Sequence, residues 1–343
     1  MKIAVMTGGG DCSGLNAAIQ AIVTRAVEYG YEVLGILNGY AGLINGDIKP
    51  LSLEDVVGIF QVGGTILGTS RTNPFKTEGG PKKAVETIKK FGIDALIAIG
   101  GDDTLSAASK LVKMGVPVIG VPKTVDNDLS ATDYSIGFES AVSTAAEAIS
   151  SLRTTAKSHH RVIVVEVMGR HAGWMTLMAG LAGGAHVILL PEQSFNIEEV
   201  CDVIKKREAK GKKYSIVAVA EGAKPKNLED LVTVSEEKDA FGHVRLGGIA
   251  RVLEKEIEKR TGKETRSVVL GHLQRGGSPD AFDRILGIRL GLFAVDLVKQ
   301  RKFGHAAVLH GTKIVAVKLE NTIKESKTVG EDLFELTKFF SLT

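Results

Sequence analysis

Two short polar segments, each directly after an apolar run, hold most of the side chains that could do chemistry. The first is GGDDT at residues 100–104, and the second is PKTVDND at residues 122–128. The apolar runs before them are typical of buried parallel strands. Four carboxylates, a lysine and two threonines would then gather at the sheet edge where α/β proteins bind ligands. Alternatively, these side chains only cap helices, because Asp and Thr are common N-cap residues.

The composition predicts two domains and small-molecule rather than nucleic-acid chemistry. A chain of 343 residues exceeds one ordinary domain. Its 43 basic and 40 acidic side chains are well mixed, so no basic face indicates nucleic acid. Cys12 and Cys201 are too few for a disulfide framework. With no signal region and no apolar run of about 20 residues, we expect a cytoplasmic protein without membrane contact.

Glycine-rich loops follow the predicted strands of the first half. Residues 2–7 are predicted to be a strand and residues 15–29 a helix, with GGGDCSG at residues 8–14 between them. Such a loop can hold phosphate through backbone amides and a helix N-terminus. Its spacing matches neither the dinucleotide fingerprint nor the Walker pattern. Arg71 closes a second glycine-rich loop with a guanidinium suited to phosphate oxygens, although a plain surface arginine is equally compatible.

The second half repeats this arrangement of polar groups after apolar strands. The predicted strands at residues 162–167, 215–220 and 266–270 end in MGRHAGW, in Glu221 and in GHLQRGG. The polar segment at residues 224–242 is expected to be a loop with a short helix. Two sets of polar strand ends could therefore face each other across a cleft.

Five motifs in this order resemble the phosphofructokinase family: the glycine loop, GGDxT, TVDND, MGRHAGW and GHLQRGG, which span residues 8–277. The resemblance implies an α/β fold of two Rossmann-like lobes, with parallel-rich sheets flanked by helices and the active site in the cleft between them. It implies a phosphoryl-donor lobe of residues 1–138 plus about 253–303. A fructose 6-phosphate lobe would comprise residues 139–252 plus about 304–343.

The family phosphorylates the 1-hydroxyl of fructose 6-phosphate with Mg²⁺, and the resemblance assigns roles to matching residues. Asp126 would be the base that accepts the hydroxyl proton. Thr124 would contact the transferring phosphoryl group, and Asp128 would help to organise the site. Asp102, an oxygen ligand for a hard cation, matches the magnesium position.

Other residues are implied for binding and for charge balance. Those implied for the donor are Gly10, Arg71, Gly101, Asp103, Thr104 and Lys123. Arg71 and Arg170 would also stabilise the phosphoryl group in flight. Those implied for the sugar phosphate, besides the residues of the TVDND motif, are Arg161, Met168, Gly169, Arg170, Glu221, Arg266, His272 and Arg275. In this family the arginines matching Arg161 and Arg266 come from a neighbouring subunit, which implies a homodimer or homotetramer with shared active sites.

Two positions indicate the phosphoryl donor. Asp103 and Lys123 stand where the ATP-using branch usually has glycine, and both match the pyrophosphate-dependent branch. A carboxylate where the α-phosphate of a nucleotide should lie would exclude ATP by charge and bulk, whereas pyrophosphate still fits. Lys123 would neutralise the departing phosphate in a readily reversible reaction. Because some ATP-using relatives carry lysine at the second position, Asp103 has more weight; the two could also form a salt bridge without bearing on the donor.

Three other functions compete with this interpretation. The nearest is an ATP-dependent phosphofructokinase. Lipid and NAD kinases share GGDxT, but the motifs at Arg170 and His272 argue against them. A non-catalytic regulatory subunit would be free to lose Asp126 and Asp102, which are both present. Gln20 and Thr24 replace the effector-binding arginines of allosteric relatives, so we expect weak or absent allosteric control.

Overall fold

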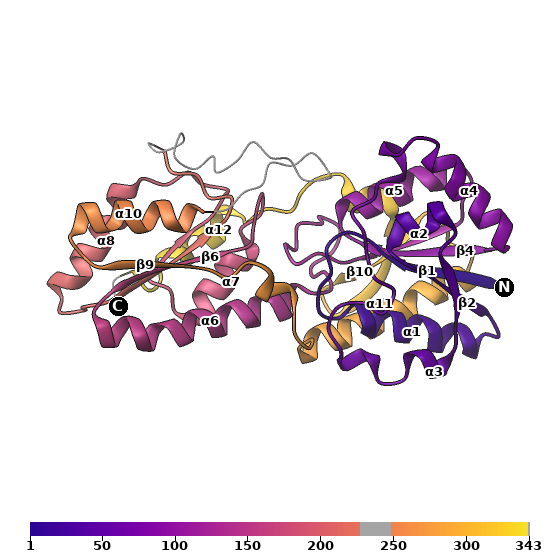
Figure 1. The fold of residues 1–343 in the computed structure, drawn as a ribbon, viewed down its shortest axis with the longest axis horizontal. Helices are drawn as coiled ribbons and strands as arrows, with labels where there is room; N and C mark the ends of the chain where they lie inside the picture. Colours follow the sequence, from indigo (N-terminus) through magenta and orange to yellow (C-terminus); the bar gives the residue numbers. More distant parts are fainter. Residues whose placement is uncertain (227–247, 342–343) are drawn as a thin grey trace. The chain divides into compact units, whose positions relative to one another are not determined.

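The computed structural model describes residues 1–226 and 248–341, which fold as two α/β units (Figure 1). The first unit comprises Met1–Ser140 and Arg275–Ser326, and the second comprises Ala141–Gln274 and Lys327–Thr343. The predicted fold class is confirmed. Most of the expected loop at residues 224–242 lies outside the described residues. No helix in the described part of the chain is long and apolar enough to cross a membrane.

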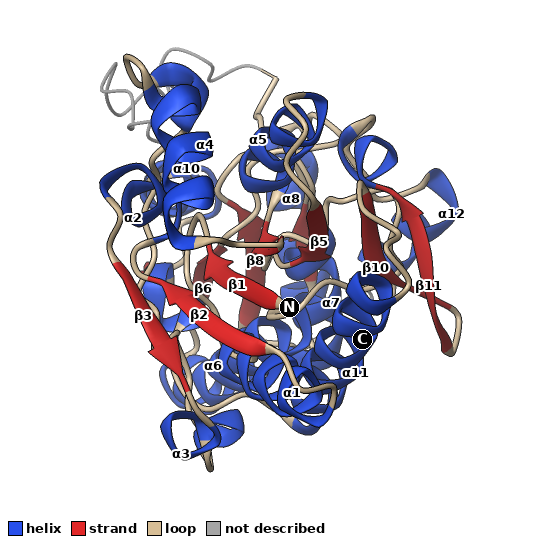
Figure 2. Cartoon of the chain, turned by 90° about the vertical axis from the view of Figure 1, so that its right-hand side faces the viewer, coloured by secondary structure: helices blue, strands red, loops and turns tan. Residues whose placement is uncertain are grey.

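The first unit is built on a seven-stranded sheet with the order β11-β10-β5-β4-β1-β2-β3. Figure 2 looks toward this unit and shows β3 and β11 at the two edges of the sheet. The edge strands pair antiparallel with their neighbours, and the inner strands are parallel. Inner strands such as β4 are apolar and buried along their whole length, as a sheet covered on both faces requires. The strands are β1 Lys2–Thr7, β2 Glu32–Ile36, β3 Ile48–Leu51, β4 Ala95–Gly100, β5 Val118–Pro122, β10 His305–His310 and β11 Lys313–Lys318.

Helices cover both faces of the first sheet (Figures 1 and 2). On one face lie α1 Leu15–Glu28, α3 Leu53–Val56 and α11 Ala281–Lys299, and on the other lie α2 Gly39–Asn45, α4 Gly80–Phe91 and α5 Asp102–Lys113. Glycine allows α1 and α11 to approach closely, since a methyl group on Gly291 would lie 2.6 Å from the carbonyl oxygen of Ala18. Short 3₁₀ turns, η1 Ile59–Gln61, η2 Pro74–Lys76 and η4 Leu319–Ile323, complete the unit.

The second unit contains a four-stranded parallel sheet with the order β7-β8-β6-β9. Its strands are β6 Val162–Val167, β7 Val187–Leu189, β8 Ser215–Ala220 and β9 Thr265–Val269. In Figure 1, α8 Ile197–Ala209 and α10 Ile249–Thr261 lie on one side of this sheet, and α6 Phe138–His159 and α7 Trp174–Gly183 on the other. The remaining elements are the 3₁₀ turns η3 Gly271–Arg275 and η5 Glu335–Lys338 and the short helix α12 Glu331–Phe334.

The units divide the C-terminal half differently from the expected lobes. Residues 253–274 were expected with the first lobe, but β9 pairs with β6 and completes the second sheet. Residues 304–326 were expected with the second lobe, but β10 pairs with β5 in the first sheet. In both cases a strand joins the parallel sheet whose open edge it can extend, which no local sequence pattern specifies.

A buried carboxylate fixes the start of α6. Asp283, on α11, is fully buried and accepts hydrogen bonds from the Gly137 amide at 2.7 Å and from the amide and hydroxyl of Ser140 at 2.8 and 2.6 Å. Its own amide donates to Asp280, the N-cap residue of α11. Burial raises the pKa of Asp283 to about 6, although these hydrogen bonds favour the ionised form.

This pKa predicts how stability depends on pH. Because the folded pKa lies above the unfolded value of 3.8, the native state binds more protons between these two values, and folding gains stability as the pH falls through 6. Between pH 7 and pH 5, the free energy of unfolding should rise by about 1 kcal/mol relative to Asp283→Asn, which cannot titrate there. Urea denaturation of both proteins at each pH measures this difference; a constant or shrinking difference would contradict the assignment.

Candidate active site

The glycine loop lies at the switch point of the first sheet. Strand β1 has β2 on one side and β4 on the other, so the order of connection reverses between β1 and β4, where α/β sheets bind ligands. The Gly8 amide, just after β1, donates to the Ile99 carbonyl of β4 at 2.9 Å. A methyl group on Gly8 would lie 2.6 Å from the Thr104 hydroxyl oxygen, so the loop packs directly on the first turn of α5.

The Lys123 side chain contacts the backbone of this loop. Its side chain is 3% exposed, and its ammonium donates to the carbonyl oxygens of Gly8, at 3.0 Å, and of Gly10. The end of β5 is thereby joined to the loop after β1. Burial lowers the pKa of Lys123, because the ammonium is removed from water. Both the lysine and the loop were predicted to bind the donor, but their direct contact was not predicted.

The segment that leads to Arg71 also lies along the glycine loop. The Gly9 amide donates to the Ser70 carbonyl at 3.1 Å, and the Thr69 hydroxyl donates to the Gly9 carbonyl at 2.6 Å. Arg71 follows directly and is exposed. The structure therefore brings the second glycine-rich loop to the first, as a shared phosphate site requires.

Asp102 and Asp103 occupy the first turn of α5, after the N-cap residue Gly101. Asp102 is exposed and Asp103 is half-buried. A helix N-terminus favours negative charge, so the fold stabilises both carboxylates there. The Tyr40 hydroxyl donates to the Thr104 carbonyl at 2.9 Å and holds this turn in place.

The carboxylates in the described part of the chain are compatible with only one kind of magnesium site. No group of three or more His, Cys, Asp or Glu side chains is arranged there to hold a metal. Mg²⁺ commonly binds to one or two carboxylates and completes its shell with water and substrate phosphates. The exposed carboxylate of Asp102, at the carboxyl end of β4, fits a site of that kind.

The TVDND loop is held by a residue whose role the sequence did not indicate. Asn127 is buried in the left-handed region, with φ of 50°. Its side-chain amide donates to the Asp133 carbonyl at 3.0 Å, and its side-chain oxygen accepts from the Ser135 amide at 3.1 Å. The Asp126 amide donates to the Thr124 hydroxyl at 3.1 Å. Asn127 thus fixes the loop between the two acids; the readiness of asparagine to adopt positive φ was the available signal.

Arg275 lies beside the glycine loop in the first unit. Its Nη1 donates to the Asp11 carbonyl at 3.1 Å, and a methyl group on Gly10 would lie 2.6 Å from that nitrogen. We expected Arg275 to bind the sugar phosphate with the rest of its motif. Its guanidinium lies beside the glycine loop, whose residues were predicted to bind the donor, and its role in binding the sugar phosphate stays a prediction.

In the second unit, contacts at the strand ends bring together several of the residues predicted to bind the sugar phosphate. The Gly222 amide, one residue after Glu221, donates to the Gly169 carbonyl at 3.1 Å. The Met168 amide donates to the side-chain oxygen of Gln274, which is 2% exposed. These contacts join the ends of β6 and β8 to η3, which carries His272. Gln274 was not predicted, because a glutamine within a motif gives no sign that it is buried.

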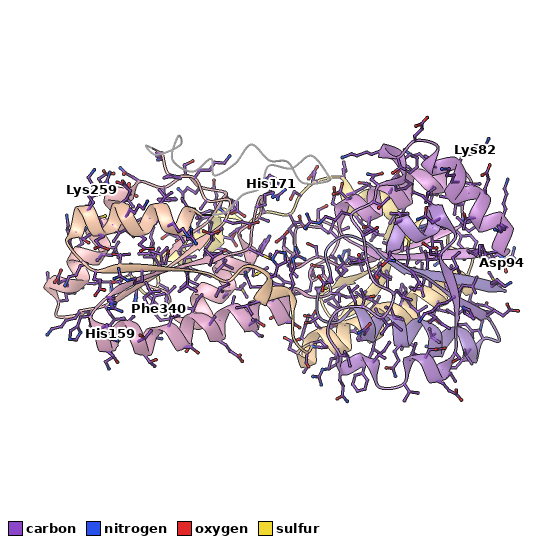
Figure 3. The ribbon with its side chains drawn as sticks, in the orientation of Figure 1. Lys82, Asp94, His159, His171, Lys259 and Phe340 are labelled. Carbon is purple, nitrogen blue, oxygen red and sulfur yellow. The ribbon has the colours of Figure 1, made fainter. Side chains whose placement is uncertain are left out.

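The structure does not bring Arg161 and Arg266 to these strand ends. Arg161 precedes β6, and Arg266 is the second residue of β9, so both lie at the amino end of the second sheet. The six residues of β6 separate them from Met168 by roughly 20 Å. Figure 3 labels one residue near each end: His159, two positions before Arg161, and the exposed His171, in the loop after β6.

Comparison with known proteins shows the family. The phosphofructokinase family model matches residues 2–298. The chain is 54% identical over 342 residues to the pyrophosphate--fructose 6-phosphate 1-phosphotransferase of Amycolatopsis methanolica, covering 99% of both chains. It is 49% identical to the ATP-dependent 6-phosphofructokinase 2 of Streptomyces coelicolor, covering 97% of both. The crystal structure of Pichia pastoris phosphofructokinase matches with a TM-score of 0.85 at 33% identity, over 99% of this chain and 37% of that one. On its motifs, its fold and these similarities, the chain belongs to the phosphofructokinase family.

Proposed function

We propose that this protein reversibly transfers a phosphoryl group from pyrophosphate to the 1-hydroxyl of fructose 6-phosphate, giving fructose 1,6-bisphosphate and phosphate. The observation that carries this proposal is the pair of charges at the glycine loop. Asp103 is half-buried in the turn that packs on Gly8, and the Lys123 ammonium is buried beneath Gly8 and Gly10. The similarity to the pyrophosphate--fructose 6-phosphate 1-phosphotransferase of Amycolatopsis methanolica supports it.

The pair of charges favours pyrophosphate over ATP. ATP must place its α-phosphate next to the two phosphates that correspond to pyrophosphate. A carboxylate in a partly desolvated site repels that α-phosphate. Pyrophosphate has no third phosphate to meet Asp103. The buried Lys123 ammonium supplies positive charge behind the loop without occupying the space in front of it. ATP-dependent relatives are nearly as similar overall, so the donor depends on these positions rather than on total identity.

The carboxylate of Asp126 takes the proton from the sugar hydroxyl as that oxygen attacks phosphorus. Thr124, whose hydroxyl accepts the Asp126 amide, contacts the phosphoryl group, and Asp128 organises the same loop. Arg71 and Arg170 stabilise the negative charge on the transferring phosphoryl group. Arg275, beside Gly10, adds a further cation on the donor side.

Asp102 would hold a magnesium ion together with the donor phosphates. The ion would neutralise their charge and orient them for attack.

Other residues of the chain bind the substrates. Gly10, Gly101 and Thr104 surround the donor, while Met168, Gly169, Glu221 and His272 surround the sugar. The free, buried thiols of Cys12 and Cys201 agree with a cytoplasmic enzyme.

We propose that the active site is completed by a second copy of the chain in a homodimer or homotetramer. Arg161 and Arg266 lie at the amino end of the second sheet, roughly 20 Å from the predicted sugar-binding residues at its carboxyl end. An arginine side chain does not reach that far, so in one chain these groups cannot share a phosphosugar. Two copies that present opposite ends of this sheet to each other would each complete the other's site.

The donor is tested by turnover of fructose 6-phosphate with pyrophosphate and with ATP. The wild type should use pyrophosphate and not ATP. Asp103→Gly alone should gain ATP activity, and the double change Asp103→Gly with Lys123→Gly should also lose pyrophosphate activity. An unchanged donor preference in both variants would refute this explanation, even if the wild type prefers pyrophosphate.

Replacing the proposed base should affect the chemical step. Asp126→Asn keeps the size of the side chain but cannot accept the proton, so kcat should fall about a thousandfold with little change in either KM. Asp94→Asn is the matched control, because Asp94 directly precedes the amino end of β4, whereas Asp126 follows the carboxyl end of the neighbouring strand. This variant should retain full activity. A loss confined to KM would assign Asp126 to binding alone.

Shared sites predict complementation between inactive variants. Asp126→Asn and the double variant Arg161→Ala with Arg266→Ala should each be inactive alone. After unfolding and refolding an equal mixture, half of the paired subunits are mixed and each mixed pair has one intact site, so about a quarter of wild-type activity should return. If all groups came from one chain, the mixture would stay inactive.

A further inference from the structure

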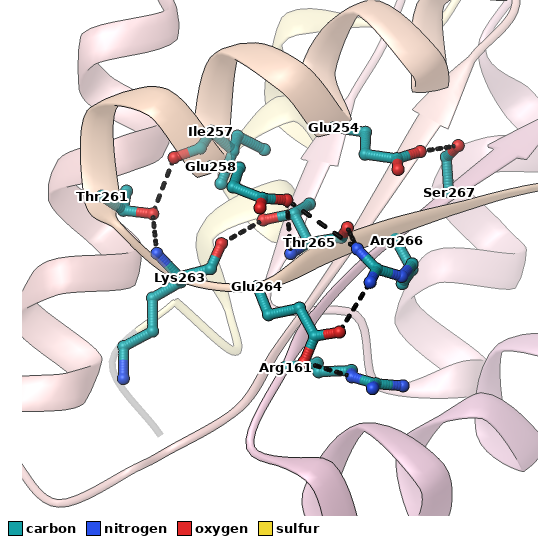
Figure 4. A network of polar contacts seen from close by, with 10 residues as sticks. All are labelled: Arg161, Glu254, Ile257, Glu258, Thr261, Lys263, Glu264, Thr265, Arg266 and Ser267. Atoms are coloured by element: carbon teal, nitrogen blue, oxygen red, sulfur yellow. Dashed lines mark hydrogen bonds and ion pairs between the residues drawn. The ribbon is translucent and has the colours of Figure 1, made fainter.

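One carboxylate lies between the two arginines at the amino end of the second sheet (Figure 4). Glu264 Oε2 is 2.7 Å from Arg161 Nε, and Glu264 Oε1 accepts a hydrogen bond of 2.7 Å from Arg266 Nη2. Each oxygen therefore binds a different guanidinium. A second carboxylate, Glu258, is 3.9 Å from Arg266 Nη1 and accepts from the Thr265 amide.

The backbone under this cluster is fixed by the sheet. The Glu264 carbonyl accepts the Val162 amide at 3.0 Å, and the Arg161 carbonyl accepts the Ser215 amide at 3.2 Å. The Arg266 Nη1 also donates to the Thr265 carbonyl at 2.8 Å. Both arginines keep substantial exposure, 29% and 51% of their side chains, so an anion can reach them from solvent.

Two adjacent guanidinium groups repel each other unless an anion lies between them. Glu264 is such an anion in the chain itself, and the Arg161 guanidinium beside it lowers the pKa of this carboxyl. It therefore stays ionised at neutral pH and keeps both arginines in one arrangement before any ligand arrives. An arginine that is already oriented loses less side-chain entropy on binding a phosphate.

We propose that Glu264 is a positioning residue that holds Arg161 and Arg266 together as one binding site for the phosphate of a phosphosugar. This rests on the proposed function, because the phosphosugar is the fructose 6-phosphate bound by another copy of the chain. Glu264 does not touch the substrate. It contributes through the two arginines, whose planar donors suit a phosphate that carries about two negative charges.

Glu264→Gln tests this role, since it keeps the size of the side chain and removes its charge. The KM for fructose 6-phosphate should rise about tenfold, because the two arginines are no longer held together, whereas kcat and the KM for pyrophosphate stay within about twofold. Glu264→Asp keeps the charge but reaches less far, so it should restore part of the affinity. Glu198→Gln removes a comparable carboxylate that pairs with Arg260 instead and should leave every parameter unchanged.

Direct binding separates this inference from the proposed reaction. Calorimetric titration of each variant with fructose 6-phosphate, without donor, should show the same order of affinity as KM, and inorganic phosphate should protect the wild type against thermal unfolding more than Glu264→Gln. Equal affinities in wild type and Glu264→Gln would overturn the role of Glu264. Tighter binding by Glu264→Gln would also overturn it, because the carboxylate would then compete with phosphate. If neither donor gives turnover in the wild type, the proposed reaction fails, and these binding orders still decide the role of Glu264.

Discussion

The contact between the Lys123 ammonium and the glycine loop is the interaction on which the proposed donor site depends. It joins the end of β5 to the loop after β1. The Thr104 side chain, in the first turn of α5, packs against the same loop. A buried cation requires compensation, and here two carbonyl oxygens provide it. One lysine therefore fixes the shape of the loop and places a positive charge directly against its backbone.

This arrangement explains how one family can use two donors on the same fold. The glycine loop, the acid on α5 and the TVDND loop come from three neighbouring strand ends of one sheet. In the proposed function, the charges at positions 103 and 123 would decide which donor fits beside the loop, and Asp126 would act on the acceptor. Donor choice and acceptor chemistry would then be carried by different residues of the same sheet edge.

Much of this site was predictable because its residues lie where apolar strands stop. The inner strands, the glycine loop and the acids after β4 and β5 follow from local patterns of apolar runs and glycines. Strand β3 was not predicted, because four residues that include a proline are too short to show a regular alternation. The partners of Lys123 and Gln274 come from contacts between distant segments, such as Lys123 and Gly8, which are 115 positions apart in the sequence. A local pattern gives no information on such contacts, and the lobe boundaries differed for the same reason.

The central claim is that charge at the glycine loop selects the donor, and equilibrium binding tests it most directly. Calorimetric titration of the wild type with imidodiphosphate, a non-hydrolysable analogue of pyrophosphate, and with the corresponding ATP analogue, both with Mg²⁺, compares the two donors without turnover. The account predicts saturable binding of imidodiphosphate and none of the ATP analogue. Binding of the ATP analogue as tight as that of imidodiphosphate would contradict it.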